Sequence, residues 1–100
     1  MKFYQQGDCL IKEVQEIPKG ENSKDNVLVE GEHTGHAHRI TNMENVVKTV
    51  VGTAIFLKVL HEVRVRHEEH KEILLPPGNY KIDQVNEYDH FEEEVRKVMD

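Results

Sequence analysis

Histidine is concentrated in two short stretches of this sequence. Residues 31–38 read GEHTGHAH and residues 67–70 read HEEH, so these stretches hold five of the seven histidines in a chain of 100 residues. Imidazole changes its protonation state near neutral pH, and it is also the commonest side-chain ligand of transition metals. The cluster therefore indicates a metal site, a metal-free pair for proton transfer, or a solvated polar patch.

The spacing of three of these histidines favours a metal site. His36 and His38 are two residues apart in a stretch that reads as a strand, so both side chains point to one face, about 7 Å apart at Cα. Imidazoles at that spacing can converge on one ion. His67 shares the apolar parity of its own stretch with Val63 and Val65. We predict His36, His38 and His67 as ligands of a divalent transition metal, with zinc, iron, nickel and copper all compatible with nitrogen ligands. A buried, hydrogen-bonded histidine is the alternative reading of each.

Two further residues suit the chemistry of such a site. Glu69 and His70 follow His67 closely, and either could be a general base or an additional ligand. A bound ion would lower the pKa of its water to near 7 and so generate a nucleophile. The sequence therefore predicts a metal-dependent hydrolase. We read the remaining histidines as structural, with His61 on the apolar face of its stretch and His90 in solvent.

Two other functions remain open. One is a metal-free phosphodiesterase of the ribonuclease type, in which one histidine removes a proton and another donates one; Arg39, Arg64 or Arg66 would steady the phosphate. The other is a non-enzymatic accessory module that self-associates. Small β domains often complete the burial of their apolar surface by oligomerising, so we expect a homo-oligomer, with Phe3 and Tyr4 as candidate contact residues.

Composition sets the outer bounds of these hypotheses. The chain is 37% hydrophobic and 32% charged, which suits one globular domain over residues 1–100. Its formal net charge of −6 disfavours nucleic-acid binding through bulk charge, although a small-molecule or phosphodiester substrate stays compatible with it. The single cysteine, Cys9, reads as a small buried hydrophobe. We find no signal-peptide pattern and no membrane-spanning stretch, so we expect a cytoplasmic protein.

The pattern of apolar residues predicts a mainly β protein. Residues 53–67 alternate with period two over much of their length, and because this exceeds an ordinary strand we expect a break near residues 60–62. One helix is expected at the C-terminus, where Asp89 could cap a turn and Phe91, Val95 and Val98 recur at helical spacing. We predict a small β-barrel or sandwich with a short C-terminal helix. Further strands are expected at residues 8–17, 27–29, 36–41, 46–51, 73–75 and 80–85, with polar loops at 18–26 and 41–45.

Part of this pattern resembles a known family. Gly31, His36, His38 and Glu44 look like the first cupin motif, and KEILLPPGNY (residues 71–80) is similar to the second. The resemblance implies a small β-barrel with a histidine-rich metal centre in its mouth. The pattern GExTGHAHR followed by HEEHxxxxLPPGxY also looks like a small uncharacterised type of bacterial and phage protein. Because one scaffold hosts many functions, neither resemblance implies a particular reaction.

Overall fold

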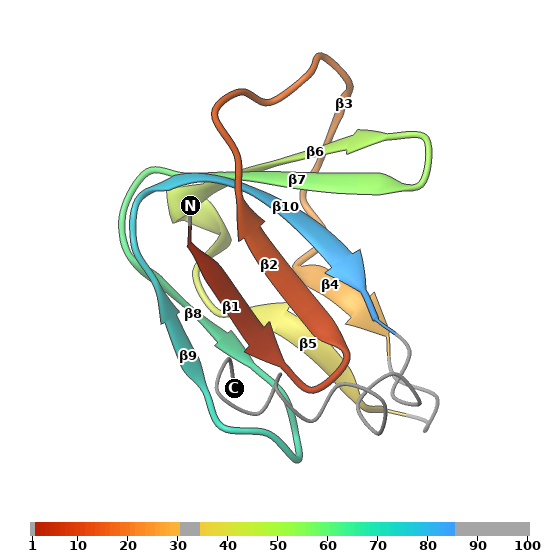
Figure 1. Ribbon diagram of the computed structural model, residues 1–100, viewed down its shortest axis with the longest axis vertical. Helices are drawn as coiled ribbons and strands as arrows, with labels where there is room; N and C mark the ends of the chain where they lie inside the picture. The colour runs from red at the N-terminus through yellow and green to blue at the C-terminus, as the bar shows by residue number, and fades with distance from the viewer. Residues whose placement is uncertain (1, 31–34, 86–100) are drawn as a thin grey trace.

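The computed structural model describes residues 2–30 and 35–85, and this part of the chain is built from β-strands (Figure 1). It contains one 3-10 turn, Met43–Asn45, and no α-helix. The predicted C-terminal helix falls in residues 86–100, outside the described residues. The strands are β1 (Phe3–Gln6), β2 (Cys9–Glu13), β3 (Glu21–Ser23), β4 (Val27–Glu30), β5 (Ala37–Ile40), β6 (Val46–Val51), β7 (Ala54–Val59), β8 (Val63–Arg66), β9 (Ile73–Leu75) and β10 (Gly78–Gln84).

The strands form two antiparallel sheets. The larger sheet has six strands in the order β1-β2-β10-β7-β6-β3, and the smaller has four in the order β4-β5-β8-β9. In Figure 1 the strands β1, β2 and β10 of the larger sheet lie in front of β5 and β8. The mainly β prediction is confirmed, but the barrel is wrong because the two sheets do not close on each other. The expected break at residues 60–62 is where the chain passes from β7 in one sheet to β8 in the other.

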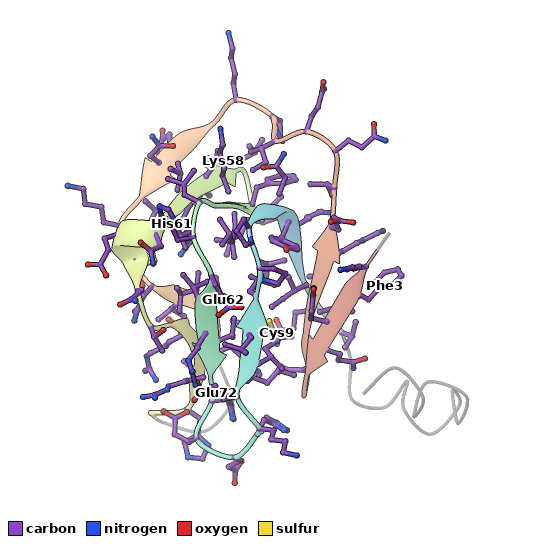
Figure 2. All side chains as sticks on the ribbon, turned by 90° about the vertical axis from the view of Figure 1, so that its left-hand side faces the viewer. Phe3, Cys9, Lys58, His61, Glu62 and Glu72 are labelled. Carbon is purple, nitrogen blue, oxygen red and sulfur yellow. The ribbon has the colours of Figure 1, made fainter. Side chains whose placement is uncertain are left out.

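The core lies between the sheets and follows from the period-two pattern. Ile11 and Leu57 of the larger sheet and Ile40 and Val65 of the smaller are all 0% exposed and belong to one cluster. Side chains of opposite parity on the same strands face outward. Cys9 belongs to this core, as predicted, and Figure 2 shows it between the sheets. Burial raises the pKa of its thiol to about 12, so Cys9 is no nucleophile at neutral pH.

The sequence pattern misplaced some elements. β1 and β3 were not expected, because their sequences, FYQQ and ENS, are too polar to show an apolar face. Both are edge strands of the larger sheet, where polar residues are tolerated. The inward placement of His61 is wrong: it falls in the break between β7 and β8 and is exposed. No helix in the described part of the chain is long and apolar enough to cross a membrane.

Candidate functional site

Four histidine rings meet at one end of the molecule. Two come from the start of β5, where His36 directly precedes the strand and His38 lies in it, and two come from the loop between β8 and β9, which carries His67 and His70. The ring centroid of His67 lies 4.3 Å from that of His38, 4.6 Å from that of His70 and 5.8 Å from that of His36. The turn between β1 and β2 lies at the same end (Figure 1).

His38 is fully buried, and both of its ring nitrogens are engaged. Its Nδ1 lies 2.7 Å from Oε1 of Gln6, and its Nε2 lies 2.8 Å from Oδ1 of Asp8. The amide of Gln6 is oriented by its other atom, because Nε2 donates to the backbone carbonyls of Val65 and Lys71. Oε1 of Gln6 can therefore only accept, and His38 must carry a proton on Nδ1.

One further proton belongs to the contact between His38 and Asp8. Burial lowers the pKa of His38, the hydrogen bond to Asp8 opposes this, and the proximity of the imidazoles of His67 and His70 lowers it further. Burial by itself raises the pKa of Asp8, but hydrogen bonds from Gln84 and His38 outweigh it, so that pKa is lowered as well. At least one of the two groups must hold the proton, because otherwise a lone pair on Nε2 of His38 would face a lone pair on Oδ1 of Asp8 at 2.8 Å. From this hydrogen-bond pattern we assign one proton, shared between His38 and Asp8, to the contact at neutral pH.

The second ring, His67, has a defined tautomer. Its Nδ1 accepts a hydrogen bond from the backbone N–H of Glu69 at 3.0 Å, so this nitrogen carries no proton. The neutral ring then holds its proton on Nε2 and is a hydrogen-bond donor at that atom. His67 is half-buried and occupies the middle of the cluster.

The remaining two rings lie toward the surface. His70 is exposed and packs over Gly7, whose backbone has a φ of +57°. A Cβ at that position would lie 2.3 Å from Nε2 of His70, so the absence of a side chain at Gly7 lets the ring occupy this position. Nδ1 of His36 lies 3.5 Å from a carboxylate oxygen of Glu69. The exposed side of the cluster therefore presents two imidazoles and one carboxylate.

Glu68 connects the loop that carries His67 and His70 to the strand that carries His38. One of its oxygens accepts the backbone N–H of Ala37 at 2.9 Å, and the other accepts Nη1 of Arg39 at 2.9 Å. The hydrogen bond from Ala37, helped by Arg39, lowers the pKa of Glu68 to about 2. This carboxylate fixes the distance between β5 and the loop.

The predicted metal ligands lie close together, but some of their ring nitrogens are already engaged in hydrogen bonds. In the described geometry His38 has no ring nitrogen left for an ion, and His67 uses Nδ1 as an acceptor. Among the residues that the structure describes, no three His, Cys, Asp or Glu side chains are arranged to hold a metal ion. His33 lies outside the described residues.

The predicted phosphate-binding arginines are all paired with carboxylates. Arg39 bonds Glu68, and Arg64 and Arg66 share Glu72 at 2.8 and 3.1 Å. Because each guanidinium is already matched, none is positioned as a dedicated anion site.

Sequence reasoning missed the residues that hold His38. Gln6 and Asp8 flank Gly7 in the first hairpin, and Gln84, at the end of β10, donates to the second oxygen of Asp8 at 2.9 Å. They lie 32, 30 and 46 positions from His38, so no local spacing marks them. The one available signal was the polar triplet QGD at a strand end, which is typical of a turn.

Comparison with known proteins gives one match. The family model described as a domain of unknown function (DUF8820) matches residues 5–84, which contain the end of β1, all of β2 to β10 and the four clustered histidines. No cupin family model matches the chain. No curated protein and no solved structure matches it.

Proposed function

Because the chain belongs to the DUF8820 family, whose description states no activity, we propose a function from the site itself: metal-free acid–base cleavage of phosphodiesters. The observation that carries the proposal is the position of His67 between His38 and His70, with its Nδ1 bound to a backbone N–H. Neighbouring imidazoles with different fixed roles are what a proton-transfer reaction needs.

Each ring has a role in this proposal. His70, the exposed ring, is the base that takes the proton from a hydroxyl of the substrate, such as a ribose 2′-hydroxyl. That oxygen attacks phosphorus, and the bond from phosphorus to the leaving oxygen breaks. His36, beside the carboxylate of Glu69, gives a proton to the leaving oxygen. The result is a cyclic phosphate and a free hydroxyl, with one proton taken up and one released.

The buried part of the cluster positions these groups. His67 would donate its Nε2–H to a phosphoryl oxygen as a neutral ring, a role in which it needs no change of protonation. His38 packs against the ring of His67 at a centroid distance of 4.3 Å, and hydrogen bonds with Gln6 and Asp8 fix its position. We therefore regard His38 as a positioning residue rather than a base.

The test is cleavage of a short oligoribonucleotide in the presence of a chelator, followed across pH. We expect cleavage to persist and its rate to show a bell-shaped pH profile. His70→Ala and His36→Ala should each lower the rate by about 100-fold or more. His61→Ala is the matched control, because this histidine is exposed and lies outside the cluster. Absence of cleavage, or equal rates in all three variants, would refute the proposal.

A metal centre of the cupin kind is the competing proposal. It is favoured by the ring spacing, since centroids 4.3 to 5.8 Å apart place His36, His38 and His67 within reach of one ion after side-chain rotation. It requires His38 to release Gln6 or Asp8, and Glu69 or His70 would then be the base. Titration of the protein with zinc, iron, nickel and copper, followed by analysis of its metal content, decides between the metal centre and the metal-free reaction. Stoichiometric uptake, with cleavage that stops in chelator, would establish the metal centre.

A further inference from the structure

The outer face of the larger sheet carries a row of aromatic and basic side chains that the histidine cluster does not involve. The strand register places Phe3 opposite Lys12, Lys12 opposite Lys81, and Lys81 opposite Phe56. The four residues thus lie side by side on β1, β2, β10 and β7. Their neighbours in each strand, Tyr4, Ile11, Ile82 and Leu57, contribute to the core, so the row faces outward.

Phe3 is the exposed member of this row, its other three members are half-buried, and the charges of the lysines are only partly matched by carboxylates. Phe3 is 47% exposed and points away from the sandwich in Figure 2. Lys81 has one partner, Asp83, at 3.4 Å. Lys12 makes no ion pair with any residue in the ranges 2–30 and 35–85, and the same holds for Lys58, which is exposed on β7 two residues from Phe56.

This arrangement is unfavourable for folding alone. Like charges directly opposite each other on neighbouring strands are destabilising, yet Lys12 and Lys81 occupy such a pair. The chain has 19 acidic residues against 13 basic ones, so a sheet face with three lysines and one aspartate runs against the overall charge. Exposed phenylalanine beside the lysines adds apolar surface that water does not favour. A ligand that is both anionic and flat would match both features.

We propose that this row, Phe3–Lys12–Lys81–Phe56, binds single-stranded nucleic acid. Phosphates would lie against the lysines and bases would stack on the phenylalanine rings, which is how exposed sheet faces bind single strands without reading their sequence. An acidic peptide would match the lysines but would not need the two rings. The net charge of −6 opposes the approach of any polyanion, so the affinity should be modest and should fall steeply with salt. The row contains no residue of the histidine cluster.

The test is fluorescence anisotropy of a labelled oligodeoxyuridylate of about twelve nucleotides titrated with the full chain at low salt. This probe lacks the 2′-hydroxyl, so it reports binding whether or not the protein cleaves RNA. We expect saturable binding that Phe3→Ala weakens at least five-fold through lost stacking. Lys12→Gln should weaken it by a similar factor and reduce the slope of log affinity against log salt by about 0.7.

Two control variants remove a side chain of the same kind from elsewhere on the molecule. Leu74→Ala removes a side chain that is 46% exposed on the smaller sheet, and Lys24→Gln removes an exposed lysine from the loop after β3. Both should bind as the unmodified protein does. The proposal would be overturned by an absence of saturable binding or by an equal loss of affinity in the two controls. It would also be overturned if a glutamate-rich peptide bound as tightly as the oligonucleotide and Phe3→Ala did not weaken the binding of either.

Discussion

Nε2 of His38 lies 2.8 Å from Oδ1 of Asp8, and the other nitrogen of the same ring is already committed as a donor to Gln6. Asp8 is an acceptor at both oxygens, since Gln84 donates to the second. The contact is thus a buried junction that holds one proton and joins β5 of the smaller sheet to the first hairpin of the larger. This junction fixes the position of the buried ring, and the other rings of the cluster lie beside that ring.

Asp8→Asn should change the protonation of His38 without removing the hydrogen bonds. The asparagine amide can donate Nδ2–H to a neutral Nε2 and still accept from Gln84 through Oδ1. We expect nitrogen NMR of the unmodified protein at pH 7 to report a proton shared at Nε2 of His38, and the variant to report a neutral ring protonated at Nδ1 only. Identical spectra for this ring in both proteins would contradict the assignment.

His38→Ala should destabilise the protein strongly. The substitution removes a ring that is 0% exposed and strands Oε1 of Gln6 and Oδ1 of Asp8 near the core. Loss of these partners and the resulting cavity should together cost about 2–4 kcal/mol. Urea unfolding measures it, with His61→Ala as a control expected to stay within about 0.5 kcal/mol. A cost below about 1 kcal/mol would mean that the junction contributes little.

The sequence predicts the layers of this fold better than its site. Alternation identified β7, β8 and the break between them, because each of these strands has one buried face. The same rule placed His38 and Ile40 inward, and both are fully buried. It failed for β1, whose polar residues are held by pairing with β2 rather than by an apolar face.

The site itself depends on contacts between distant segments. Spacing drew attention to His36, His38, His67 and His70, and the structure brings these rings together. What spacing could not show is that His38 is bonded at both nitrogens, since Gln6 and Asp8 reach it only after the two sheets pack. For that reason the metal-ligand role of His38 stays a prediction that must compete with those hydrogen bonds.

Glu68→Gln should reduce the loss of stability at acid pH. The folded-state pKa of Glu68 is about 2, below its ordinary value of 4.5. A carboxylate with a lowered pKa stabilises the fold above its unfolded pKa, and this contribution is lost as the pH falls from about 4.5 toward 2. We expect the unmodified protein to lose more stability over that window than the variant does, as measured by urea unfolding at several pH values. Parallel curves would show that Glu68 does not connect β5 to the histidine loop in solution.

Gly7→Ala and Gly52→Ala form a matched pair of variants that tests whether the ring of His70 packs over Gly7. Both glycines have left-handed backbones, with φ of +57° and +60°, so alanine should cost about 1 kcal/mol at either position. They differ in their surroundings: a Cβ at Gly52 meets nothing within 4 Å, whereas a Cβ at Gly7 would lie 2.3 Å from Nε2 of His70. The ring can move aside, so the expected difference between the two variants is in the position of His70 rather than in stability. We expect similar urea midpoints, a changed imidazole NMR signal of His70 in Gly7→Ala alone, and loss of phosphodiester cleavage in that variant alone. An unchanged His70 signal in Gly7→Ala would show that the ring does not pack over Gly7.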